Sequence, residues 1–441
     1  MSSAMQRDIP EGYKQTEVGV IPEDWAVSTI GENTRWSSGG TPNRKRDDYW
    51  EGSIPWISGS TLKTLEISTS DQFITAEGVT AGSNMAPVNS TLLLVRGSAL
   101  HKCIRAGLVT SPVSFNQDVK SLMPTGSVHP RFLTFFIKGM ESELLKLVSS
   151  AGNSAGVLDT LLVKNFKFLK PSFSEQTAIA NALSDVDALI TSLESLITKK
   201  RAIKTAAMQQ LLTGKKRLPP FDKTHTGYKQ TELGEIPEDW EWKLLPELVI
   251  SGGNEIKIGP FGSALKKEYL TKDGYKVYGQ ENVYDKDMVV GDRFIDHEHY
   301  SQLVSCSIKP GDFLISMMGT VGKCFIVPKV MQEGIMDSHL LRLRIDRNKL
   351  DKKLLIQFFQ SPLVLRQIKQ LSVGGIMEGL SSKIIKSIAV PVGSIEEQKK
   401  IAQALESVDT EVDAIAQRLT KTRQLKQGMM QELLTGKTRL V

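Results

Sequence analysis

The chain has 441 residues, of which 40% are hydrophobic and 24% are charged, and its formal net charge is +6. This length exceeds one typical domain core, so we expect several domains. No apolar run approaches the roughly eighteen residues of a membrane span, and no apolar leader suggests secretion. Three cysteines without CxxC spacing argue against a disulfide framework and favour the cytoplasm.

The first distinctive segment, GYKQTEVGVIPEDW at residues 12–25, recurs as GYKQTELGEIPEDW at residues 227–240, with twelve of fourteen positions identical. A second repeat relates QQLLTGKKRL at residues 209–218 to QELLTGKTRL at residues 431–440. Repeats at such wide spacing indicate a duplicated structural unit. The chain is therefore two copies of one unit with nearly constant ends and divergent middles.

The two middles, residues 27–170 and 242–391, alternate short apolar runs with turn residues. Runs such as SIPWIS, TLLLV, FLIS, KCFIV and LLRLRI are typical of strands. Each middle continues with a helical pattern, at residues 131–148 or 350–371, and one more strand, FKFL or SIAVP. The middles are therefore predicted to be strand-rich α+β domains.

Each copy ends in a long predicted helix, which opens with a Ser-x-x-Glu capping pattern at residues 172–175 or 394–397 and stops at Gly214 or Gly436. Apolar residues then follow at alternating steps of four and three, which is the heptad of a coiled coil. After Leu419 the steps become four, through Leu425, which predicts local unwinding. A helix of about 60 Å cannot bury its stripe on one small domain, so the two helices are expected to pack together. The predicted core residues are Ile179, Leu183, Val186, Ile190, Leu193, Ile197, Ile401, Leu405, Val408, Val412, Ile415 and Leu419.

Three stretches imitate catalytic or metal motifs. TGKT at residues 435–438 lacks the first glycine of a phosphate-binding loop, since that position is Gln431, and it closes a helix. LPPF at residues 218–221 has Leu218 where the motif of amino-methyltransferases needs an amide or carboxylate, so it is interpreted as a linker. HEH at residues 297–299 lacks the histidine spacing of a zinc helix. No catalytic, metal or cofactor site is expected in this chain.

Basic and amide side chains gather in glycine- and serine-rich loops of both middles. Such loops let backbone N–H groups approach phosphates, and Arg, Lys, Asn and Gln can hydrogen-bond base edges. Each loop alone fits an ordinary solvated turn, but recurrence in both middles favours nucleic acid. The candidates of the first middle are Ser38, Gly39, Gly40, Thr41, Arg44, Lys45, Arg46, Arg96, His101, Lys102, Arg105, Asn116 and Gln117. Those of the second are Lys257, Phe261, Ser263, Lys266, Lys267, Gln280, Asn282, Lys323, Arg342 and Arg344.

The paired middles and heptad helices, with the segments GYKQTEVGVIPEDW, SEQTAIANALSDVDALI and EEQKKIAQALESVDTEVDAI, resemble the specificity (S) subunit of type I DNA restriction-modification systems. The resemblance covers essentially the whole chain. It implies that two target recognition domains each read half of a bipartite, asymmetric site in double-stranded DNA. It also implies that the helices form an intramolecular antiparallel coiled coil between these domains, with a pseudo-two-fold repeat.

The resemblance further implies partners that do the chemistry. Two modification (M) subunits would dock on the repeated ends, carry S-adenosylmethionine and methylate adenine at N6. Restriction (R) subunits would add DNA cleavage driven by ATP with Mg. The chain itself would be a non-catalytic, sequence-specific DNA-binding subunit.

A coiled-coil scaffold with paired protein- or carbohydrate-binding domains is the alternative to DNA recognition, and an enzyme in its own right is a third hypothesis.

The expected layout has alternating constant and variable segments. The segments are a lead-in at 1–26, a recognition domain at 27–170, a long helix at 171–218, a linker with the repeated lead-in at 219–241, a second recognition domain at 242–391 and a long helix at 392–441.

Overall fold

The structure, a computed structural model, divides into two compact units. Unit 1 comprises Met1–Glu194 with Gln417–Val441, and unit 2 comprises Ser195–Ala416, so the division falls inside both long helices. No helix among the described residues is long and apolar enough to cross a membrane. The first eight residues of the lead-in and residues 232–233 of its repeat lie outside the described part of the chain. The described residues are 9–151, 155–223, 227–231, 234–318, 322–371 and 380–440.

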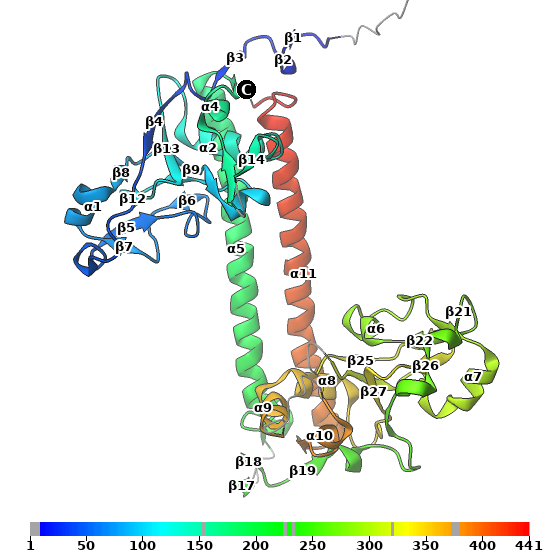
Figure 1. Ribbon diagram of the computed structural model, residues 1–441. Coiled ribbons are helices and arrows are strands. Elements are labelled where there is room, and N and C mark those ends of the chain that lie inside the picture. Colours follow the sequence, from blue (N-terminus) through cyan, green and yellow to red (C-terminus); the bar gives the residue numbers. More distant parts are fainter. Residues whose placement is uncertain are drawn as a thin grey trace, which may run out of the picture. The chain divides into compact units, whose positions relative to one another are not determined.

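In unit 1 the first middle folds into short strands and helices (Figure 1). The strands are β3 (Ala26–Thr29), β4 (Thr34–Ser38), β5 (Ile54–Ile57), β6 (Glu66–Ile67), β7 (Phe73–Ile74), β8 (Asn84–Ala86), β9 (Thr91–Leu94), β10 (Arg96–Gly97), β11 (Ala106–Val109), β12 (Val113–Phe115), β13 (Val119–Pro124), β14 (Val148–Ala151), β15 (Ala155–Leu158) and β16 (Lys167–Lys170). The helices are α1 (Ala76–Gly82), α2 (Pro130–Gly139), α3 (Glu141–Leu145) and α4 (Thr160–Lys164). One sheet has the order β4-β13-β9-β11-β6 and another the order β7-β5-β12-β8.

In unit 2 the second middle repeats this arrangement. Its strands are β19 (Glu241–Leu244), β20 (Ile256–Ile258), β21 (Leu270–Thr271), β22 (Tyr275–Tyr278), β23 (Phe294–Ile295), β24 (Phe313–Ser316), β25 (Cys324–Ile326), β26 (Gly334–Met336), β27 (Leu340–Leu343) and β28 (Ala389–Val392). Its helices are α6 (Gln280–Tyr284), α7 (His297–Gln302), α8 (Lys352–Gln360), α9 (Pro362–Leu371) and α10 (Ser382–Lys386). The sheet order β20-β27-β24-β25 matches β4-β13-β9-β11, and the parallel pair β22–β26 matches the parallel pair β5–β12. The α+β repeat predicted from the sequence is confirmed.

The two helical stretches predicted near the end of each middle are interrupted. The stretch 131–148 becomes α2 and α3, and its last residue already belongs to β14. The stretch 350–371 becomes α8 and α9, because Pro362 lacks an N–H donor and disfavours helical geometry at Ser361 before it. The predicted helix type was right, and the predicted continuity was wrong.

The first and last strands of each middle pair with one another. In unit 1, β3 runs antiparallel to β16, with Ala26 opposite Lys170. In unit 2, β19 runs antiparallel to β28, with Glu241 opposite Val392. The chain therefore enters and leaves each domain at one place, next to the start of a long helix.

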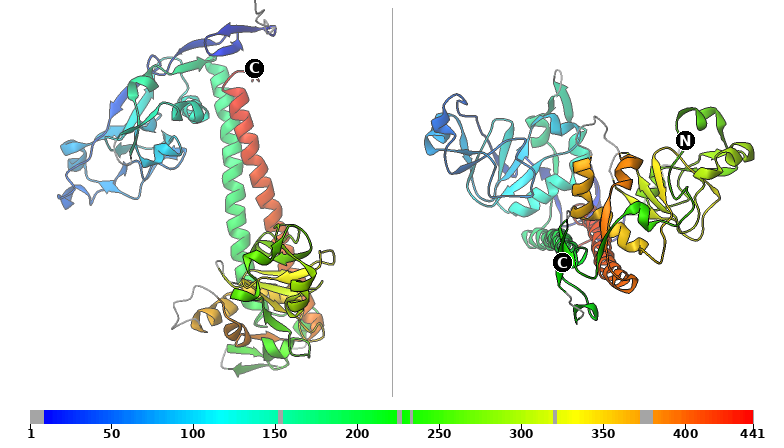
Figure 2. Two further views of the ribbon diagram at one scale, coloured as in Figure 1. Left: turned by 45° about the vertical axis from the view of Figure 1, so that its right-hand side comes forward. Right: turned by 90° about the horizontal axis from the view of Figure 1, so that it is seen from below.

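Each lead-in is a hairpin followed by a buried tryptophan. The hairpins are β1 (Tyr13–Thr16) with β2 (Gly19–Pro22), and β17 (Tyr228–Thr231) with β18 (Gly234–Pro237). In unit 1 the hairpin lies across the C-terminal end of α11 (Ile395–Leu433), which is drawn in red in Figure 2. There the Tyr13 hydroxyl donates to the Gly436 carbonyl over 3.0 Å. In unit 2 the Tyr228 hydroxyl donates to the Gly214 carbonyl over 3.3 Å.

A buried carboxylate anchors each tryptophan to a long helix. In unit 1 the indole N–H of Trp25 donates to Glu175 over 3.0 Å, and Arg439 donates to the same carboxylate. In unit 2 the indole of Trp240 and the guanidinium of Arg217 both donate to Glu397.

These anchors modify the capping prediction. Ser172 and Ser394 accept the backbone N–H of the glutamate three residues on, as a capping serine should. The glutamate carboxylates bind tryptophan and arginine instead of returning to the serine N–H. The serine part of the predicted capping box is therefore confirmed, and the glutamate part is wrong.

The long helices α5 (Phe173–Leu211) and α11 (Ile395–Leu433) run antiparallel. In unit 1 Lys426 pairs with Asp187 over 2.6 Å and Arg423 pairs with Glu194 over 2.5 Å. In unit 2 Lys204 pairs with Asp409 over 2.6 Å and Lys200 pairs with Glu411 over 2.5 Å. In these pairs the residue numbers rise along α5 while those of their partners fall along α11, so the two helices are antiparallel.

The apolar heptad residues of both helices are buried or half-buried. Leu425, predicted on the packed face, is 59% exposed, whereas Thr422 is 7% exposed. The predicted unwinding after Leu419 is therefore wrong. The heptad continues with polar residues at its inner positions, because Lys426 finds a carboxylate on α5.

Both helix ends take the predicted glycine turn. Gly214 and Gly436 have φ values of +70° and +73°, in the left-handed region. A Cβ on either would lie 2.5 Å from the proline ring of the neighbouring hairpin, Pro237 or Pro22. The TGKT stretch is thus a helix end, as the sequence predicts.

Candidate nucleic-acid interface

The loop face of the first middle, residues 27–170, is organised by two parallel strands. β5 and β12 run parallel, with Trp56 opposite Ser114 and Ile57 opposite Phe115. Parallel strands end at the same edge of a sheet. The loops that follow them, residues 58–60 and 116–118, are therefore neighbours although they are far apart in sequence.

A glycine loop completes this edge. The Gly40 N–H donates to the Phe115 carbonyl over 2.9 Å, and a Cβ on Gly39 would lie 2.0 Å from that same oxygen. Only glycine lets the backbone cross the end of β12 so closely. Thr41 then donates its hydroxyl to the Gln117 side-chain oxygen over 2.7 Å.

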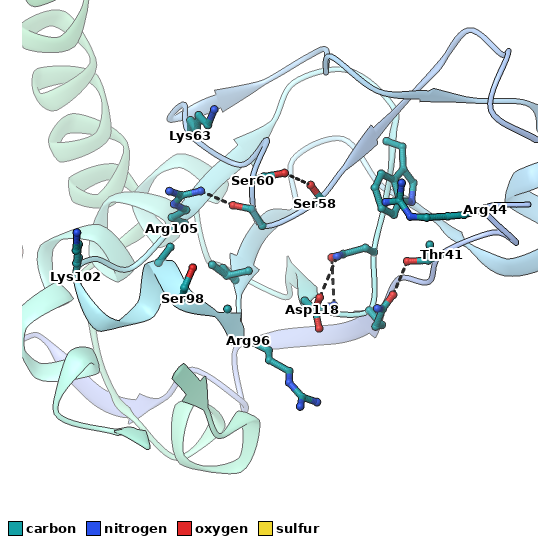
Figure 3. A pocket seen from close by; sticks show the side chains of 17 residues that line it. Thr41, Arg44, Ser58, Ser60, Lys63, Arg96, Ser98, Lys102, Arg105 and Asp118 are labelled. Atoms are coloured by element: carbon teal, nitrogen blue, oxygen red, sulfur yellow. Dashed lines mark hydrogen bonds between the residues drawn. The ribbon is translucent and has the colours of Figure 1, made fainter. Parts of the chain in front are cut away.

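These loops enclose a cavity of about 870 Å³. Cationic side chains from separate segments surround it, with Arg44 at one end and Lys102 at the other in Figure 3. One carboxylate, Asp118, accompanies them. The lining residues are Thr41, Arg44, Trp56, Ser58, Gly59, Ser60, Lys63, Leu94, Arg96, Gly97, Ser98, Ala99, Lys102, Arg105, Asn116, Gln117 and Asp118.

The structure brings together about half of the first domain's candidates. Those lining the cavity are Thr41, Arg44, Arg96, Lys102, Arg105, Asn116 and Gln117. Those outside it are Ser38, Gly39, Gly40, Lys45, Arg46 and His101. Among the latter, Gly39 and Gly40 shape the edge through their backbone.

Sequence reasoning missed the loop after β5, which contributes Ser58, Gly59, Ser60 and Lys63. The signal was present, because SGSTLK is a glycine-serine turn followed by a lysine, the pattern used for the other candidate loops. Asp118 was also missed. Its Oδ2 accepts the Asn116 amide over 3.2 Å.

Two aromatic platforms support arginines in this domain. The Cζ of Arg44 lies 4.7 Å from the Trp50 ring centroid and 5.2 Å from that of Trp56. The Cζ of Arg46 lies 4.6 Å from the Tyr49 ring, but Arg46 is also paired with Asp48. This ion pair lowers the pKa of the Asp48 carboxyl, chiefly through the hydrogen bond from Arg46.

The second domain forms its corresponding edge from β22 and β26. A Cβ on Gly259 would lie 1.9 Å from the Asp337 carbonyl, just as Gly39 meets Phe115. The surrounding side chains are different: Phe261 is 64% exposed and Met318 is 46% exposed. Arg293 spans two carboxylates at this edge, reaching Glu281 and Asp337 at 2.9 Å each.

Three candidates prove to be interior. Arg342 is fully buried and donates to the carbonyls of Ser307 and Asn254, and burial lowers its pKa, with a smaller contribution from the nearby charge of Arg344. Asn282 is fully buried, and Asn116 is 6% exposed.

The polar atoms of both asparagines are already occupied. Asn282 accepts the Gly279 N–H and donates to the carbonyls of Asp287 and Val290. Asn116 accepts the Asp118 N–H and donates to its carboxylate. Arg342, Asn116 and Asn282 therefore hold the fold and leave no exposed fork or amide for a base. The alternation of side chains along a strand predicted that Arg342 and Arg344 share one face of the strand. It did not show that this face is interior.

The other candidates of the second domain are spread over several loops. Lys266 is paired with Glu268 over 3.1 Å, and Arg344 contacts Asp312 over 3.3 Å. Gln280 is half-buried and weakly accepts the Ser316 hydroxyl at 3.4 Å. Lys257 is half-buried, and the exposed ones are Phe261, Ser263, Lys267 and Lys323.

No group of three or more His, Cys, Asp or Glu side chains in the described ranges is placed to hold a metal ion. The HEH stretch lies in α7, where His299 contacts Asp296 over 2.8 Å and His297 contacts the Tyr275 hydroxyl over 3.0 Å. These contacts give both histidines partners inside the domain.

Residues 22–204 and 237–424 match the protein family described as "Type I restriction modification DNA specificity domain". The chain is 26% identical over 438 residues to the type I restriction enzyme MjaVIII specificity subunit of Methanocaldococcus jannaschii, covering 98% of this chain and 96% of that protein. It is 32% identical over 189 residues to the EcoR124I/EcoR124II specificity subunit of Escherichia coli, covering 42% and 45%. The structure of a type I restriction-modification S subunit from M. genitalium aligns with a TM-score of 0.54 at 18% identity, covering 93% and 96%. At that identity the likeness shows a shared fold.

Proposed function

The chain belongs to the family of type I restriction-modification DNA specificity proteins, and from this premise we propose that its two loop edges are its DNA-reading surfaces. It is a non-catalytic specificity subunit whose recognition domains bind a bipartite, asymmetric DNA site. The observation that supports this assignment is the basic cavity of unit 1. It gathers five cationic side chains around glycine and serine backbone at the edge of a sheet, as phosphate and base contacts require.

The edge of unit 2 is proposed as the second reading surface. Its exposed Phe261 and Met318 offer apolar contact suited to a thymine methyl group, and Gln280 and Lys323 add polar contact. Because the two edges differ in charge and polarity, they would select different half-sites. The proposed exchangeable segments are residues 27–170 and 242–391.

The repeated framework is proposed to receive two modification subunits. The same tyrosine, tryptophan and arginine contacts hold the hairpin in each unit, so the chain offers one local surface twice, once in each unit. Identical partners require such repeated surfaces. S-adenosylmethionine would be carried by the modification subunits, and ATP and Mg by restriction subunits that join the assembly in the cytoplasm.

Two measurements test this function: adenine methylation maps of host DNA, and duplex DNA binding by the full-length chain with its modification subunits. We expect the methylation maps to show a bipartite motif that is present only with this chain. We also expect affinity to fall steeply with salt, because phosphate contacts release counterions. Affinity indifferent to salt and to competitor sequence would favour the scaffold alternative, and methylation or cleavage by the chain alone would favour an enzyme.

Exchange of residues 27–170 for another recognition domain tests the division of labour. One half of the methylated motif should change completely, and the other half should stay as it was. A control exchange of residues 242–391 should alter the opposite half. Changes in both halves from a single exchange would refute independent reading.

A further inference from the structure

Arg44 stands apart from the other cations of the unit 1 cavity because aromatic rings support it. Its guanidinium lies over Trp50 and Trp56, whose own rings meet edge-to-face with centroids 5.0 Å apart. Trp56 is 1% exposed and so forms a fixed floor. Stacking on a ring leaves the N–H groups in the guanidinium plane available for bonding.

The loop that carries Arg44 is held at two points by the same tryptophans. The Trp56 indole N–H donates to the Gly40 carbonyl over 3.1 Å, and the Trp50 indole N–H donates to the Asn43 carbonyl over 3.2 Å. The Arg46 N–H donates to that Asn43 oxygen as well, over 3.1 Å. Arg44 therefore projects from an ordered turn, which reduces the entropy lost when it binds.

The neighbouring Arg46 has a carboxylate partner, and Arg44 has none among the described residues. Arg46 also stacks on a ring, but it donates to both oxygens of the Asp48 carboxylate, at 3.0 and 2.5 Å. Among the described residues, Arg44 has no ion pair and no hydrogen bond from its guanidinium. Its donor edge faces the cavity unoccupied, whereas that of Arg46 is already used.

The remaining cavity cations have a different character. Lys63, Arg96 and Lys102 are exposed and have no ring beneath them among the described residues. Arg105 donates to the Gly59 carbonyl and so helps to hold the loop after β5. The two lysines are flexible point charges, which suit phosphates, and Arg96 carries a fork that no ring holds in place. A planar fork that is held in place suits a base edge.

We propose that Arg44 is a specificity-determining residue of the first recognition domain, reading guanine in the major groove through paired hydrogen bonds to O6 and N7. Arginine in this bidentate arrangement is the commonest specific contact to guanine. Lys63 and Lys102 position the DNA backbone beside it. This inference rests on the proposed DNA-reading function of the cavity and predicts a G·C pair in the half-site that this domain reads.

The experiment uses the assembly purified from its own cells through a tag on the full-length chain. A randomised duplex library and the adenine methylation map first define the wild-type motif. Matched duplexes differing at one G·C pair then measure discrimination, which we expect to be about 10- to 100-fold. Arg44→Lys keeps the charge and removes the fork, so it should make that single position degenerate while the salt dependence stays unchanged.

Two variants serve as matched controls. Arg46→Lys, two residues away on its own ring, should leave the motif intact because its donors are already used. Lys63→Ala should weaken all duplexes alike and lower the salt slope by about 1. Thermal unfolding of each variant shows whether the fold is retained. Arg44→Gln provides a second variant at the same position, which lacks both the charge and the fork.

The outcomes separate this inference from the proposed function. A wild-type assembly with no bipartite motif would refute the proposed function itself. A clear wild-type motif that Arg44→Lys and Arg44→Gln both leave unchanged would refute the role of Arg44 alone. Uniform weakening by Arg44→Gln with a lower salt slope would make Arg44 a phosphate contact, which also overturns the inference.

Discussion

The anchors of the two units are nearly identical, whereas their loop edges carry different chemistry. Glu175 in unit 1 and Glu397 in unit 2 each accept one tryptophan and one arginine. The sheet edges repeat the parallel strands and the close glycine, yet one is surrounded by cations and the other by apolar groups and neutralised carboxylates. Repeated contacts thus mark the shared framework, and unrepeated side chains mark the surfaces that we propose to read different half-sites.

The anchors also differ in burial, which allows the comparison to be tested. Arg217 in unit 2 has a side chain only 5% exposed, whereas its counterpart Arg439 in unit 1 is 23% exposed. A hydrated arginine tolerates the loss of a carboxylate better than a buried one. The same substitution should therefore cost unit 2 more than unit 1.

The largest expected effect comes from Glu397→Gln. It leaves buried Arg217 with Asp239 as its remaining carboxylate and should lower the unfolding free energy of unit 2 by about 3 kcal/mol. Glu175→Gln should lower that of unit 1 by roughly half as much, because Arg439 is more exposed. Denaturant unfolding followed by tryptophan fluorescence measures both.

Glu406→Gln is the control, since its pair with Lys353 is exposed on both sides and should contribute close to nothing. Equal losses from Glu397→Gln and Glu175→Gln would contradict the link between burial and cost.

Next in size are Gly214→Ala and Gly436→Ala. Each places a Cβ in a left-handed backbone conformation and against a proline ring, so each should cost about 2 kcal/mol. Equal losses would show that the two helix ends are equivalent. Gly428→Ala in α11 is the control, because its Cβ meets nothing within 4 Å and should stabilise the helix by roughly 1 kcal/mol.

Smaller effects are expected from the polar pairs inside the coiled coil. Asp409→Asn leaves Lys204, whose side chain is 11% exposed, with Gln360, and should cost about 1 kcal/mol. Asp187→Asn should cost less, because the Lys426 side chain is 21% exposed. Thermal unfolding of both variants checks the order, and a larger loss from Asp187→Asn would break it.

The smallest effect concerns pH and unit 1. The hydrogen bond from Arg439 lowers the pKa of Asp24 below its ordinary value. A carboxyl with a lowered folded pKa stabilises the fold above its unfolded pKa, and this contribution is lost as pH falls through the folded value. Asp24→Asn should therefore cost less than about 1 kcal/mol at pH 7. The difference between wild type and variant should begin to shrink as pH falls below about 4, where the unfolded carboxyl becomes protonated, and should disappear below the lowered folded pKa. A difference in denaturant titrations that stays constant from pH 7 into acid would refute this assignment.

Local patterns in the sequence were sufficient for much of the fold. The duplicated segments predicted two related units, and the heptad residues from Ile179 to Leu419 predicted paired helices. Serine caps, terminal glycines and strand runs were also readable, because these features depend on neighbours a few residues away. The cationic loop from Arg44 was visible for the same reason.

Only the tertiary structure decided which of these residues meet. Parallel pairing of β5 and β12 brings residues 58–60 beside residues 116–118, and strand order cannot be read from one sequence. The same long-range packing buries Arg342, exposes Leu425 and draws the capping glutamates to tryptophans more than a hundred residues away. It also places Arg44 over Trp56 at an open cavity, whereas the partner of Arg46 is Asp48, only two residues along the chain.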